Sequence, residues 1–126
     1  MPPEPADVID HLAFEVSDLA AAARFYDAVF YALGVRRLDE SEQHVAYGVN
    51  QPLLWIVARE REPGPSYGHV ALAATGKAAV DGAHAAGLRA GGVDDGAPGA
   101  RPQYGARCYA GYLRDPDGLA VEVVAR

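Results

Sequence analysis

The sequence predicts an α+β fold built from two tandem copies of one βαβββ module. The two halves of the chain align at an offset of 58 residues, which places His69 over His11. Each half opens with a strand-like and then a helix-like segment, and continues as short strands broken by turns. We expect the modules at residues 7–58 and 67–126, within one domain of residues 1–126. One module has too little core to be stable alone, so the two are expected to pack together.

The opening segments of the two halves carry the same local signals. Residues 10–15 and 68–73 alternate apolar and other residues, as a half-buried strand does. Ser17 and Thr75 follow at equivalent positions, and both residue types commonly begin helices. Apolar residues at helical spacing come next, in a thicker stripe in the first half than in the second. Glycine then closes both predicted helices, at Gly34 and at 91–92.

After each predicted helix the pattern changes to short strands. The first half has three strand candidates, and the second half has two clear ones around the turn 115–118, Asp-Pro-Asp-Gly. Residues 91–103 are rich in Gly, Pro and Asp, so we expect a loop there with a short strand near Val93. The strand candidates are residues 35–38, 43–48, 53–58, 107–114 and 119–124.

Composition excludes several classes of partner. The net charge is −6, which argues against a nucleic-acid backbone or an anionic membrane as the main partner. Cys108 is the only cysteine, so no disulfide can form within the chain, as suits a reducing cytoplasm. The proline-rich start lacks the features of a secretory signal, and no apolar run is long enough to span a membrane. We therefore expect a cytoplasmic protein.

Three residues of metal-ligand type fall on one face of the predicted strands. Because strand side chains alternate, His11, His69 and Glu122 lie opposite the face that packs on the helices. A carboxylate flanked by valines is costly to bury without a positive partner. Two histidines and one carboxylate suit Fe(II) or Mn(II), and the same ligand types serve catalytic Zn(II). The alternative is that each is an ordinary exposed or hydrogen-bonded residue.

Motifs along nearly the whole chain resemble the vicinal oxygen chelate superfamily, the glyoxalase/bleomycin resistance/dioxygenase group. In the first half these are residues 9–12, 16–20, 25–26 and 33–34. The second half is similar to a lactoylglutathione-lyase-like branch, through residues 68–71, 90–92, 95–104, 108–110 and 115–118, together with Glu122. Each motif is weak alone, and their order and spacing carry the resemblance.

The resemblance implies a curved, partly open mixed sheet around a concave cavity. It also implies a divalent metal, which we expect to be Fe, Mn, Zn, Ni or Co, held by His11, His69 and Glu122. The fourth ligand position of glyoxalase I enzymes falls near residues 54–56, where this chain has no ligand. This departure puts a four-ligand site in doubt and favours a pattern like that of extradiol dioxygenases and fosfomycin-type resistance enzymes.

The resemblance implies chelation of a small oxygenated substrate by the metal, in a lyase, isomerase or dioxygenase. The candidate catalytic residues are Glu122 and, as an acid or base, Tyr109. An alternative is a metal-free, drug-sequestering protein of the bleomycin-resistance type, and a further one is a dimer without chemistry. Members usually form homodimers, with the modules arranged within or across chains. The candidate substrate-binding residues are Tyr47, Trp55, Arg101, Tyr104 and Tyr112.

Overall fold

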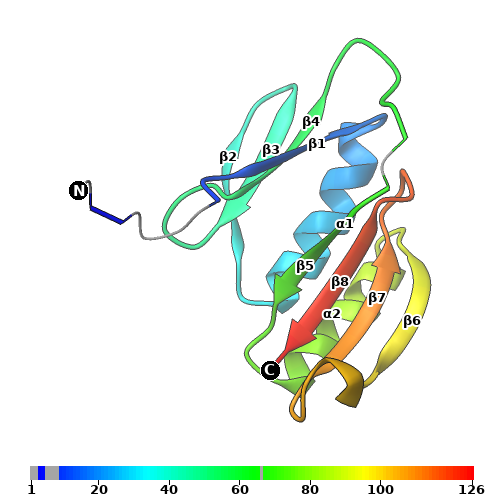
Figure 1. Ribbon diagram of the computed structural model, residues 1–126. Helices are drawn as coiled ribbons and strands as arrows, with labels where there is room; N and C mark the ends of the chain where they lie inside the picture. The colour runs from blue at the N-terminus through cyan, green and yellow to red at the C-terminus, as the bar shows by residue number, and fades with distance from the viewer. Residues whose placement is uncertain (1–2, 5–8, 66) are drawn as a thin grey trace.

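The computed structural model describes residues 3–4, 9–65 and 67–126. Two modules follow each other along the chain, each with one helix and four strands (Figure 1). The first contains β1 (Leu12–Val16), α1 (Leu19–Ala32), β2 (Arg36–Glu40), β3 (His44–Gly48) and β4 (Leu54–Ala58). The second contains β5 (His69–Ala73), α2 (Lys77–Arg89), β6 (Val93–Ala100), a short 3-10 helix (Pro102–Tyr104), β7 (Tyr109–Arg114) and β8 (Ala120–Ala125).

The two modules have the same sheet topology, which confirms the predicted α+β class. The strand orders are β1-β4-β3-β2 and β5-β8-β7-β6. In each sheet the first strand of the module pairs in parallel with the last, and the remaining pairs are antiparallel. Within the described residues no strand pairing joins the two sheets, so β1 and β5 are both edge strands.

The helices begin one residue later than the sequence predicted. Asp18, rather than Ser17, caps α1, and its Oδ1 accepts a hydrogen bond from the Ala21 amide at 3.1 Å. Ser17 instead donates its hydroxyl to Asp117 Oδ1, 100 residues along the chain, at 2.6 Å. Gly76, rather than Thr75, begins α2. The predicted glycine closure is confirmed, since Gly34 and Gly91 have φ of 81° and 100°.

Residues 93–100 form an eight-residue strand where the sequence predicted mainly a loop. β6 lies at the edge of its sheet and pairs with β7, with register shifts between Asp94 and Gly96 and between Gly96 and Gly99. An edge strand with bulges tolerates proline and glycine because one side of its backbone needs no partner. Hydrogen bonds to the neighbouring β7 therefore make residues 93–100 a strand, although their composition is typical of turns.

The hydrophobic core lies between the sheets and the helices, which Figure 1 shows behind the strands. Phe25 and Val29 of α1 are fully buried and face Gly87 of α2 closely enough that a Cβ there would lie 3.0–3.2 Å from them. The buried Tyr26 hydroxyl of α1 also donates to Asp115 Oδ2 at 2.7 Å, in the turn between β7 and β8. The modules of one chain thus pack through their helices and this turn. No helix in the described ranges has the length and apolar character needed to cross a membrane.

Candidate functional site

The second module places a histidine and a carboxylate side by side on the face of its sheet opposite α2. β5 and β8 pair in parallel with Ala71 opposite Glu122 and His69 opposite Ala120. Because the residues opposite them are alanines, the two side chains can approach each other, and His69 Nε2 lies 3.6 Å from Glu122 Oε1. The alternation that predicted a shared face for these residues is therefore correct in this module.

The Glu122 carboxylate lies in a sheltered position. Its side chain is 15% exposed, whereas that of His69 is 62% exposed. Across the described part of the chain, no group donates a hydrogen bond to Glu122, and His69 is the only basic side chain within 4 Å of its carboxylate. A shielded carboxylate without donors is unfavourable unless a positive group pairs with it. The arrangement therefore suits a cation bound between the two side chains.

A pocket of about 390 Å³ opens beside this pair. Tyr112 lies opposite Glu122 in the register of β7 and β8, so its ring borders the carboxylate. Burial, followed by the negative charge of Glu122, raises the pKa of Tyr112. The phenol is therefore neutral and can donate a hydrogen bond to a ligand oxygen. The pocket is lined by His69, Asp95, Tyr104, Tyr112, Leu113, Ala120, Val121, Glu122 and Arg126.

Arg101 lies next to this pocket, in a second hollow that shares Asp95, Tyr104 and Tyr112 with it. The guanidinium carbon lies 5.3 Å from the centre of the Tyr112 ring, a cation–π distance. Nη2 donates to the Ala97 carbonyl at 2.7 Å. Sequence reasoning selected Arg101, Tyr104 and Tyr112, and the structure brings all three to one end of the second module.

The predicted histidine of the first module lies elsewhere. His11 precedes β1, is 53% exposed, and its Nδ1 lies 2.7 Å from Asp10 Oδ1. Across residues 3–4, 9–65 and 67–126, no three His, Cys, Asp or Glu side chains gather closely enough to hold a metal ion. The structure thus brings together two of the three predicted ligands, His69 and Glu122. His11 of the same chain lies apart from them.

The register identifies the residue of the first module that corresponds to Glu122. Ala13 lies opposite Trp55 in the pairing of β1 with β4, as Ala71 lies opposite Glu122 in the pairing of β5 with β8. Trp55 therefore occupies the place where the second module has its carboxylate. Its ring meets the His44 imidazole edge-on, with 5.0 Å between the ring centres.

Two of the selected tyrosines face the helices and not the pocket. The Tyr47 hydroxyl donates to Asp27 Oδ1 of α1 at 2.6 Å, and burial, then this bond, raises the pKa of Tyr47. The Tyr109 hydroxyl donates to Asp81 Oδ1 of α2, also at 2.6 Å. Tyr109 shares its strand face with the buried Leu113, so the period of two could have excluded it from the pocket.

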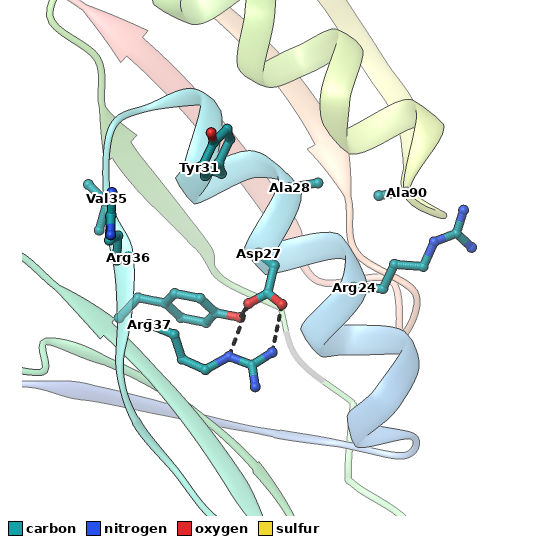
Figure 2. Close-up of a pocket in the computed structure, with 9 residues that line it drawn as sticks. Arg24, Asp27, Ala28, Tyr31, Val35, Arg36, Arg37 and Ala90 are labelled. Atoms are coloured by element: carbon teal, nitrogen blue, oxygen red, sulfur yellow. Dashed lines mark hydrogen bonds and ion pairs between the residues drawn. The ribbon is translucent and has the colours of Figure 1, made fainter.

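A larger groove, of about 770 Å³, lies on the helix side of the first module (Figure 2). Asp27 reaches from α1 toward Arg37, and Arg37 Nη2 lies 2.6 Å from Asp27 Oδ2. Arg24 extends away from this pair, so the basic side chains do not converge on one point. The groove contains none of the predicted metal ligands, and we assign it no part in the chemistry.

Sequence reasoning missed two charged residues that line the His69–Glu122 pocket, Asp95 and Arg126. Arg126 Nη1 donates to the Tyr104 carbonyl at 3.1 Å, and Asp95 Oδ2 pairs with Arg114 Nε at 3.1 Å. Glu122, Val124 and Arg126 are two residues apart along the chain and share one strand face. Strand alternation could therefore have placed Arg126 beside the pocket. Asp95 lies in the segment expected to be mainly loop, where alternation could not be applied.

A family model described as the Glyoxalase/Bleomycin resistance protein/Dioxygenase superfamily matches residues 8–123. The chain therefore belongs to this superfamily, which confirms the resemblance found in its motifs. No significant match is found among curated proteins.

Solved structures share the fold. A glyoxalase/bleomycin resistance protein from Albidiferax ferrireducens T118 has 26% identity and a TM-score of 0.84, with 95% of this chain and 99% of that chain covered. Lactoylglutathione lyase from Agrobacterium tumefaciens has 24% identity and a TM-score of 0.68, with 98% and 96% covered. Fosfomycin resistance protein FosX from Mesorhizobium loti has 20% identity and a TM-score of 0.69, with 97% and 94% covered. The last two likenesses concern the fold alone.

Proposed function

We propose that this protein binds a divalent metal and acts on a small oxygenated substrate that chelates it, as a glyoxalase- or dioxygenase-like enzyme. The observation that carries the proposal is the sheltered Glu122 carboxylate, with the His69 imidazole 3.6 Å away at the edge of a pocket. Both are ligand types that divalent metals accept. The superfamily to which the chain belongs includes glyoxalases and dioxygenases by its description, which adds support.

The third ligand in this proposal is His11 of a second copy of the chain. β1 and β5 are edge strands, and an unpaired edge favours association with another chain. Ile9, Leu12 and Leu53 are exposed beside His11, as at a surface covered in a dimer. A two-fold dimer would form two equivalent sites, each from the first module of one chain and the second module of its partner.

The local contacts of these residues suit their proposed roles. Asp10 contacts His11 Nδ1, which leaves Nε2 available as a ligand in the way that outer carboxylates commonly orient histidines. When bound, the metal would supply Lewis acidity toward two neighbouring substrate oxygens. The neutral Tyr112 phenol would donate a hydrogen bond to a substrate oxygen, and Trp55 would form an apolar wall.

Metal content tests the proposal directly. The protein is purified without chelator or affinity nickel, reloaded with Fe(II), Mn(II), Zn(II) or Ni(II), and analysed by elemental analysis. We expect about one metal per chain, because one His-His-Glu set suffices for binding, and its loss in His69→Ala. A melting temperature of His69→Ala equal to that of metal-free wild-type protein shows that the loss is not unfolding. No metal in the wild-type protein after reloading contradicts the enzyme proposal.

Mixing two inactive variants tests whether the site is shared between chains. His11→Ala and Glu122→Gln are each expected to lose the metal. In randomly mixed two-fold dimers, half the dimers contain both variants and each of those has one intact site, so about a quarter of wild-type metal content should return. If the ligands all come from one chain, no metal returns on mixing.

A second candidate function is sequestration of a ligand without metal. Two observations favour sequestration. Trp55 stands in place of a fourth ligand, and His11 lies apart from His69 and Glu122 within one chain. The similar protein from Albidiferax ferrireducens T118 also has bleomycin resistance in its name. Ligand binding by wild-type protein that takes up no metal would establish this alternative.

A further inference from the structure

We propose that the ligand of the His69–Glu122 pocket carries a carboxylate, and that Arg101, stacked on Tyr112, binds it. The inference rests on the proposed function for the His69–Glu122 pocket and concerns the adjoining hollow that contains Arg101. It assigns the substrate to the class of small oxygenated organic acids.

Arg101 is held in place by contacts that do not use all of its donors. The guanidinium lies over the face of the Tyr112 ring, and the Ala97 carbonyl accepts a hydrogen bond from Nη2. Nε is buried and has no hydrogen-bond partner within the described residues. Burying a guanidinium N–H without a hydrogen-bond acceptor is unfavourable. A buried donor without an acceptor in a native structure calls for an explanation. A ligand oxygen that accepts a hydrogen bond from Arg101 Nε would supply one.

The charges around the pocket leave Arg101 free for that acceptor. Arg114 pairs with Asp95, the one carboxylate among the described residues that lines the hollow of Arg101, and neutralises its charge. Neither Arg101 nor Arg126 forms an ion pair with a carboxylate of the described residues. The hollow of Arg101 therefore carries positive charge, whereas the Glu122 side of the neighbouring pocket carries negative charge.

The spacing sets the size of the ligand. Arg101 lies on the Tyr112 ring, and Tyr112 is the cross-strand neighbour of Glu122. Opposite residues in an antiparallel pair have Cβ atoms about 5 Å apart, so Arg101 and Glu122 are separated by roughly one aromatic side chain. A ligand with a carboxylate at one end and chelating oxygens about one ring away would span them. The planar guanidinium matches a carboxylate better than a point charge does.

Titration of metal-free protein with benzoate, phenylphosphonate and neutral benzamide tests the inference separately from the metal. The readout is the side-chain Nε–H signal of Arg101 in a ¹H–¹⁵N spectrum, with dissociation constants from calorimetry. We expect benzoate to shift this signal and to bind at least tenfold more tightly than benzamide. Tighter binding of phenylphosphonate than benzoate would overturn the assignment to a carboxylate.

Matched variants complete the test. Arg101→Gln should weaken benzoate binding about tenfold, and Arg101→Lys should recover only part of it, because lysine keeps the charge and loses the planar fork. Arg107→Gln removes the same charge from an exposed position that lines neither hollow, and should leave benzoate binding unchanged. Equal binding of benzoate and benzamide, or equal effects of Arg101→Gln and Arg107→Gln in folded protein, would overturn the inference. Failed metal uptake with intact benzoate binding would refute the proposed enzyme and not the carboxylate site.

Discussion

The two modules share one backbone plan and differ in the side chains that fill it. The offset of 58 residues places Phe25 over Ala83 and Tyr26 over His84, and all four side chains are buried in the helices. The first helix thus fills its interface with large rings, and the second with small residues that let the helices approach closely. On the opposite faces of the sheets, the tryptophan of β4 corresponds to the glutamate of β8.

The buried polar residues show how the same position takes different roles. Tyr26 bonds to Asp115 of the other module, whereas His84 Nε2 lies 3.0 Å from Asp94 Oδ1 within its own module. Tyr26 therefore helps to join the two modules, and His84 does not. The second module supplies the pocket, with a carboxylate, a histidine and an arginine at its borders. The same helix position thus joins the modules in one half and bonds within its own module in the other.

The largest expected effect comes from giving the first helix the residue of the second. Phe25→Ala removes a fully buried ring between the helices, and we expect a loss of about 3–5 kcal/mol in the free energy of unfolding. Urea denaturation measures the loss. Tyr31→Ala on the same helix, where the side chain is 78% exposed, should change the free energy by about 0.5 kcal/mol or less. Similar losses in both variants would contradict the assignment of Phe25 to the joining core.

A smaller loss is expected where the modules are joined by a hydrogen bond. Tyr26→Phe leaves the buried Asp115 Oδ2 without its donor and should cost about 1–3 kcal/mol. Tyr109→Phe makes the same chemical change in an exposed bond to Asp81, within one module. Water replaces that donor, so we expect about 1 kcal/mol or less. Thermal unfolding of both variants measures the difference, and the reverse order would refute the role of Tyr26.

The smallest expected effect comes from giving the first module the carboxylate of the second. Trp55→Glu places a potential ligand at the position equivalent to Glu122, and we expect metal affinity to rise about tenfold, or 1.4 kcal/mol. Competition with a chelator of known affinity measures the change. Trp55→Gln is the control, since it removes the ring without adding charge. Equal affinities of the two variants would show that Trp55 lies away from the metal.

Local signals in the sequence determined the repeat, both helices with the glycines that close them, and every strand except β6. They also identified the faces of β5 and β8, because alternation along a strand depends only on backbone geometry. His69 and Glu122 were selected for this reason, whereas Arg101, Tyr104 and Tyr112 were selected for their side-chain chemistry, and the structure brings all five to one module. Alternation had not been applied to β3 and β7, so Tyr47 and Tyr109 were assigned to the pocket although they face the helices.

Contacts between segments far apart in the sequence decided the features that local signals did not predict. Ser17 has the chemistry of a helix cap, but Asp117 in the other module binds its hydroxyl, and Asp18 caps the helix instead. Residues 93–100 have the composition of a loop, and β7 makes them a strand by supplying hydrogen-bond partners. The separation of His11 from His69 likewise follows from how the helices pack, with β1 and β5 left as edges. A residue's own type and its neighbours along the chain do not carry this information, because it depends on partners that only the folded chain brings near.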